Sequence, residues 1–198
     1  MVQQNTAENA AQNPAQNTAA KVRYVNAEWR DRDETPRIGS RETRRANTSF
    51  QDTMVYDARP RLAAGELDLA SSGFTLAKNQ TAVTDFRDDA QVAAKYYGEM
   101  EALVCRATGA DRAIAKSHLV RTETPIDFND GYSRFVHCDY NMARIEDLTE
   151  ELFEREGIVA QDNWTYAWYN TWQPFDHAVV NNPLAVIDWQ SLPMADVI

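Results

Sequence analysis

Short runs rich in β-branched and aromatic residues recur along this chain, and they constrain its fold more than any other feature. They are residues 22–26, 53–57, 67–70, 74–77, 113–121, 133–140, 163–172 and 184–189. Runs of this length, separated by Gly, Pro, Asn or Ser, are typical of strands. The sequence therefore predicts a mainly β domain with a few flanking helices.

Two segments have helical spacing instead. From Asp88 to Ala107 apolar residues recur every three or four positions, acidic residues begin the segment, and Gly109 follows it. Residues 145–156 predict a second, shorter helix with outward-facing glutamates. In residues 163–172 the tryptophans are four apart, which also fits a helix, but β-branched and aromatic density favours a strand.

Composition limits the partners of the chain. Its 198 residues carry a net charge of −10, which disfavours nucleic acids and anionic membranes as partners. Residues 1–20 are almost entirely Ala, Asn, Gln and Thr, so we expect a disordered tail followed by one domain over residues 21–198. No apolar run could span a bilayer, and the start is unlike a secretory signal. The two cysteines, Cys105 and Cys138, fit a reduced cytoplasmic protein.

The residues that most directly indicate chemistry are His137 and Asp139. In a strand, residues i and i+2 point to the same side, so this imidazole and carboxylate would face one way. They would supply two ligands of the 2-His-1-carboxylate triad that binds non-haem Fe(II) and leaves positions open. The His-x-Asp spacing alone is weak evidence, because a structural histidine beside an aspartate has the same pattern.

A series of short motifs resembles the hydroxylase/desaturase family, which includes cephem 7-alpha-methoxylase-related proteins and fungal secondary-metabolite oxygenases. In order, the motifs occupy residues 81–86, 96–99, 117–121, 136–139, 170–174 and 182–188. No single motif is specific, but their order and approximate spacing together cover roughly residues 54–192. The family-level resemblance therefore covers most of the chain after its N-terminal quarter.

The resemblance implies a double-stranded β-helix, or jelly roll, that uses Fe(II) and 2-oxoglutarate to hydroxylate or desaturate a small natural-product-type molecule. It implies that His137 and Asp139 hold the metal. Gln173 stands where the family usually has Arg, and the family's distal His lies beyond the motif that ends at Asp188, close to the last residue, Ile198. We therefore expect an incomplete jelly roll, from a truncated chain or one completed by a second chain or by homo-oligomerisation.

Other candidate site residues have structural alternatives. His177 could replace the third ligand or be an exposed loop histidine. His118 and Arg121 match a family motif and could line the co-substrate pocket, or they could form ordinary hydrogen bonds and ion pairs. Asn170 and Trp172 are further pocket candidates. If no metal binds, the alternatives are a non-catalytic domain that binds a small molecule and an interaction domain that pairs edge strands.

Overall fold

The computed structural model describes residues 17–122, 135–179 and 183–197. Residues 1–16 of the expected tail and residues 133–134 of an expected strand lie outside this part. The chain divides into two compact units. The first unit contains residues 17–76, 135–136 and 184–197; the second contains residues 77–122, 137–179 and 183.

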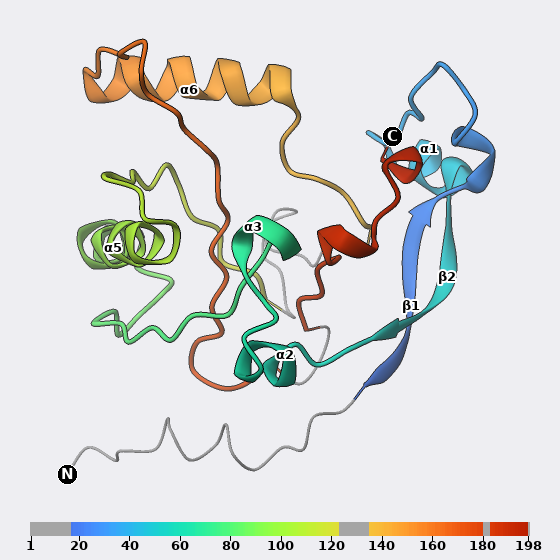
Figure 1. The fold of residues 1–198 in the computed structure, drawn as a ribbon, viewed down its shortest axis with the longest axis horizontal. Helices are drawn as coiled ribbons and strands as arrows, with labels where there is room; N and C mark the ends of the chain where they lie inside the picture. The colour runs from blue at the N-terminus through green and yellow to red at the C-terminus, as the bar shows by residue number, and fades with distance from the viewer. Residues whose placement is uncertain (1–16, 123–134, 180–182, 198) are drawn as a thin grey trace. The chain divides into compact units, whose positions relative to one another are not determined.

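A two-stranded antiparallel ribbon forms one part of the first unit (Figure 1). Strand β1 (Thr18–Val25) pairs with β2 (Thr48–Val55) along their full lengths, and Lys21 Nζ lies 2.8 Å from Asp52 Oδ1 across the ribbon. The ribbon confirms the strand expected over 22–26 and most of that over 53–57. Residues 18–20, which we expected in the tail, belong to β1. Arg23 of β1 also forms an isolated parallel bridge with Phe135.

Two short helices lie between these strands. A 3-10 turn, η1 (Ala27–Trp29), follows β1, and α1 (Arg41–Asn47) leads directly into β2. Ser40 and Thr43 form a reciprocal capping box at the start of α1, which satisfies backbone N–H groups that the helix itself leaves unpaired.

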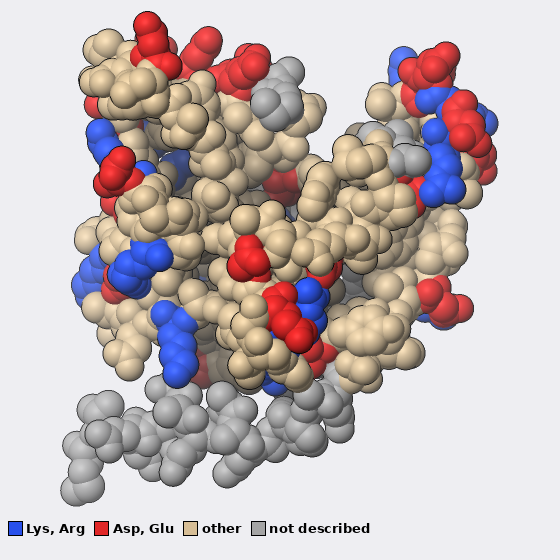
Figure 2. All heavy atoms as spheres, viewed as in Figure 1, with Lys and Arg blue, Asp and Glu red and all other residues tan. Residues whose placement is uncertain are grey.

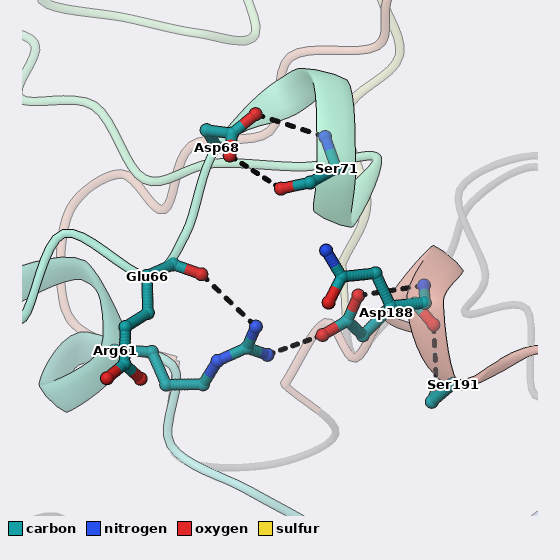
Figure 3. A network of polar contacts seen from close by, with 7 residues as sticks. Arg61, Glu66, Asp68, Ser71, Asp188 and Ser191 are labelled. Atoms are coloured by element: carbon teal, nitrogen blue, oxygen red, sulfur yellow. Dashed lines mark hydrogen bonds and ion pairs between the residues drawn. The ribbon is translucent and has the colours of Figure 1, made fainter.

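The described part of the first unit has four further short helices. They are α2 (Arg59–Ala63), α3 (Leu69–Ser72), η4 (Trp189–Ser191) and η5 (Met194–Asp196). Arg61 of α2 donates to Asp188 Oδ2 at 2.5 Å and to the Glu66 carbonyl at 3.2 Å (Figure 3). Asp188 also caps η4, so this ion pair ties the C-terminal segment to α2.

The second unit contains the long helical segments. Helix α4 (Asp89–Gln91), a π-helical turn η2 (Val92–Tyr96) and α5 (Tyr97–Thr108) follow one another without a break, which confirms the helix expected over 88–107. Asp88 caps its start, and Gly109, with φ 76°, ends it.

Helix α6 (Met142–Glu156) confirms the second expected helix. It begins three residues before the expected start because the Asn141 side chain accepts a hydrogen bond from the Arg144 N–H. Figure 2 shows acidic side chains gathered over α6. Its exposed acidic residues are Glu146, Asp147, Glu150, Glu151, Glu154 and Glu156.

The apolar core lies mainly in the second unit. Val92 is fully buried in η2, and Met100 of α5 and two leucines of α6, Leu148 and Leu152, are nearly so. Many large apolar side chains elsewhere stay exposed, among them Tyr166, Trp172, Leu184 and Val186. The buried part of the fold is therefore small for a chain that is 43% hydrophobic.

Several expected strands are absent from the described structure, where β1 and β2 form the sheet. Residues 113–121, 163–172 and 184–188 belong to no strand or helix, and residues 136–140 and 74–77 likewise form none. Residues 69–72 form α3 because Asp68 accepts hydrogen bonds from two N–H groups of its first turn. A strand needs a hydrogen-bonded neighbour, and the local pattern of residues does not supply one.

The described fold therefore combines a small sheet with several helices, and it is more helical than we expected. The helices among the described residues include none that is long and apolar enough to cross a membrane.

Candidate metal site

His137 and Asp139 lie at the start of the segment 137–179 of the second unit, and their side chains approach each other. His137 Nε2 lies 3.1 Å from Asp139 Oδ1, and about half of each side chain is exposed. The two groups converge as the i, i+2 spacing predicted, although residues 136–140 are not a strand. Cys138, between them, is an exposed free thiol.

The second carboxylate oxygen of Asp139 has a different partner. Asn170 donates from Nδ2 to Asp139 Oδ2. Tyr140 in turn donates its hydroxyl to Asn170 Oδ1 at 3.2 Å. Burial, and secondarily the negative charge of Asp139, raises the pKa of Tyr140 above its ordinary value of 10, so the phenol remains a donor at neutral pH.

Aromatic packing connects this group to α6. The rings of Tyr140 and Trp168 have centroids 5.5 Å apart. Trp168 Nε1 donates to Thr149 Oγ1 at 3.0 Å, and Thr149 is a buried residue of α6. Trp168 and Asn170 both contact Tyr140, although the segment 163–172, which we expected to be a strand, is not one.

The two other histidines lie apart from this pair. His118 has a partner on each ring nitrogen: the Tyr97 hydroxyl is 3.0 Å from Nδ1, and Asp89 Oδ1 is 3.2 Å from Nε2. His177 is an exposed loop residue whose N–H donates to the Phe175 carbonyl. Within the described part of the chain, no three His, Cys, Asp or Glu side chains gather as a metal site would require.

Of the remaining residues that the sequence analysis singled out, Asn170 contacts the His137–Asp139 pair. Asn170 joins the group around Asp139, whereas Arg121 and Trp172 are exposed. Gln173 accepts from Asn79 Nδ2 at 2.8 Å and from the Tyr96 hydroxyl at 3.2 Å, so this amide connects residues of the second unit rather than meeting His137.

Sequence reasoning missed Tyr140 and the contact of Trp168 with α6. Strand parity would have placed Tyr140 on the face opposite Asp139, and it holds only for an extended segment with regular pleating. The signal available in the sequence was the density of aromatic residues around 164–172, which we had used only to favour a strand.

A family model described as Oxidoreductase/YMDC permease-like domain matches residues 12–198. A curated relative from Aspergillus novofumigatus, the Fe(II)/2-oxoglutarate-dependent dioxygenase nvfI, is 29% identical over 82% of this chain and 59% of its own length. The alpha-ketoglutarate-dependent dioxygenase phiK, from a fungal species, is 31% identical over 78% of the chain and 56% of its own. The hydroxylase/desaturase efuI of Hormonema carpetanum is 29% identical over 81% and 58%.

A solved structure of the iron and alpha-ketoglutarate-dependent endoperoxidase NvfI superposes with a TM-score of 0.52 and 26% identity. The superposition covers 69% of this chain and 52% of that one. The chain thus spans about half the length of the relatives that it matches. The names of these relatives confirm the resemblance inferred from the motif order. The relatives of the chain include fungal Fe(II)/2-oxoglutarate-dependent dioxygenases and hydroxylase/desaturases. Because the family model matches nearly the whole sequence, the chain belongs to the Oxidoreductase/YMDC permease-like domain family.

Proposed function

We propose that this chain carries the His-x-Asp part of a non-haem Fe(II)/2-oxoglutarate-dependent oxygenase that acts on a small natural-product-type molecule. The relatives named as dioxygenases and hydroxylase/desaturases support the reaction class. The similarity to the solved NvfI endoperoxidase supports a jelly-roll fold. Two free cysteines, Cys105 and Cys138, support a reducing, cytoplasmic location.

The observation that carries the proposal is the separation of His137 Nε2 from Asp139 Oδ1, which is 3.1 Å. Two ligands at right angles around a metal, each with a bond of roughly 2.1 Å, are about 3.0 Å apart by simple trigonometry. The pair therefore fits two adjacent positions of an octahedral iron site. The same distance suits a hydrogen bond from Nε2–H, which is the arrangement expected without metal.

His137 and Asp139 would hold the metal, and the other ligand positions would take 2-oxoglutarate, oxygen and a further protein ligand. When bound, Fe(II) supplies the redox chemistry that couples decarboxylation of 2-oxoglutarate to oxidation of the substrate. His137 would bind through the lone pair of Nε2 as a neutral imidazole, with its ring proton on Nδ1. Asp139 brings a negative charge that partly offsets that of the cation.

Anaerobic titration of the full chain with Fe(II), followed by calorimetry, tests the proposal. Wild-type protein should bind one equivalent, and His137→Ala or Asp139→Ala should abolish saturable binding. His118→Ala is the matched control, because it removes an imidazole whose two ring nitrogens face Tyr97 and Asp89 instead. Binding that persists in both site variants, or that is lost in the control alone, would show that the metal lies elsewhere.

A metal-free binding domain is the second candidate. It is favoured by the absence of a three-donor group among the described residues and by exposed aromatic side chains such as Trp164 and Trp172. The same titration separates the two candidates, since this one predicts no saturable Fe(II) binding to the wild-type chain.

A further inference from the structure

We propose that Asn170 is a positioning residue that restrains Asp139 to binding metal through one oxygen, and that Tyr140 fixes the orientation of the Asn170 amide. The inference rests on the proposed function, because it assigns roles around the same metal site. It concerns residues that would not touch the metal themselves.

The two oxygens of Asp139 have separate partners. Oδ1 faces His137 Nε2, whereas Oδ2 accepts a hydrogen bond from Asn170 Nδ2. A carboxylate that binds through both oxygens uses two coordination positions, and an oxygenase site must leave positions open for its co-substrate and oxygen. Occupying Oδ2 with an amide N–H keeps the carboxylate monodentate and keeps Oδ1 directed toward the position beside His137.

The orientation of the Asn170 amide follows from its two neighbours. An ionised carboxylate only accepts hydrogen bonds, so the NH2 group of Asn170 must face Asp139. Its carbonyl oxygen then faces the Tyr140 hydroxyl, which donates to it at 3.2 Å. A flipped amide would set its oxygen against the Asp139 carboxylate and lose the bond from Tyr140, so the two contacts reinforce one orientation.

Tyr140 is itself anchored to a helix. Its ring packs on Trp168, and the indole N–H of Trp168 is bonded to the buried Thr149 hydroxyl of α6. The Thr149 hydroxyl also donates to the Ile145 carbonyl at 2.7 Å. A continuous series of contacts therefore runs from the interior of α6 through Trp168, Tyr140 and Asn170 to Asp139. These contacts hold the exposed loop that carries Asp139 in one conformation, which a metal ligand needs.

The test is a titration of the full chain with Co(II) alone, followed by its visible absorption. Asn170→Ala should weaken Co(II) binding by about 10- to 100-fold, which is typical when a partner of a metal ligand is removed. Tyr140→Phe keeps the ring on Trp168 and removes the hydroxyl, so it should weaken binding less. Asn163→Ala removes an exposed amide from the same segment and should leave the affinity unchanged.

A double variant separates positioning from a general structural effect. Because Tyr140 acts through Asn170, adding Tyr140→Phe to Asn170→Ala should lower the affinity no further, whereas independent structural losses would add. If Asn170→Ala does not fold, Tyr140→Phe alone decides the matter, since an unchanged affinity in it contradicts the inference.

The outcomes distinguish this inference from the proposed function. A wild-type chain that fails to bind Co(II) overturns both. Binding that depends on His137 and Asp139 but is unchanged in Asn170→Ala overturns only the positioning role of Asn170.

Discussion

Val92 offers the sharpest test of the core of the second unit. It is fully buried in the π-helical turn η2, in the unit that carries His137. Val92→Ala removes two methyl groups, and burial of each is worth about 0.8 kcal/mol. With the cavity that remains, the free energy of unfolding should fall by about 2–3 kcal/mol.

The matched control is Val159→Ala, the same substitution at a side chain that is 83% exposed. It should change the free energy of unfolding by no more than about 0.5 kcal/mol. Urea unfolding followed both by circular dichroism and by tryptophan fluorescence measures the two variants and shows whether the transition is cooperative. Similar losses in both variants would refute the assignment of Val92 to the core.

Three further perturbations probe other contacts. The hydrogen bond from Arg61 holds the pKa of Asp188 below its ordinary 3.8, so its stabilisation is complete above that pH and is lost as the pH falls through the lower folded-state pKa. Arg61→Gln should therefore lower urea stability at pH 7, and its difference from wild type should shrink on acidification below 3.8; a difference that does not depend on pH would contradict this. Burial, and secondarily the charge of Glu99, raises the pKa of Tyr96 above 10. Glu99→Gln should therefore lower this pKa while leaving it above 10. Ultraviolet titration measures it, after the titration curve of the Tyr96→Phe variant is subtracted to isolate the signal of Tyr96. Trp168→Phe removes the N–H donated to Thr149 and should cost about 1 kcal/mol in urea unfolding, whereas an unchanged stability would mean that this bond contributes nothing.

The helices could be predicted from the sequence because their signals are local. Hydrogen bonds within a helix join residues four apart, so apolar spacing between Asp88 and Ala107 and the terminal Gly109 were sufficient. Helix α6 begins earlier than the apolar spacing predicted because the Asn141 side chain caps it, and apolar spacing gives no information about caps. The strands were predicted less well because pairing is not local: residues 163–172 have strand composition but no ladder neighbour in the described structure.

The candidate site was predictable to the same extent. His137 and Asp139 lie close together as we expected, but residues 136–140 are not the strand from which that expectation was argued. Asn170 is 31 residues from Asp139, so no local rule links its amide to that carboxylate. The family resemblance brought Asn170 into consideration as a pocket residue, and the structure shows its hydrogen bond to Asp139. The contact of Tyr140 with Asn170 depends on the loop conformation, which regular strand geometry does not describe.

The position of the metal itself tests the central claim most directly. Crystals of the full chain, loaded with Fe(II) without oxygen, would be measured by anomalous diffraction at the iron edge. We expect a peak about 2.1 Å from both His137 Nε2 and Asp139 Oδ1, with Asp139 Oδ2 still bonded to Asn170. A peak at other residues, or no peak beside a His137–Asp139 pair that keeps its 3.1 Å contact, would contradict the account.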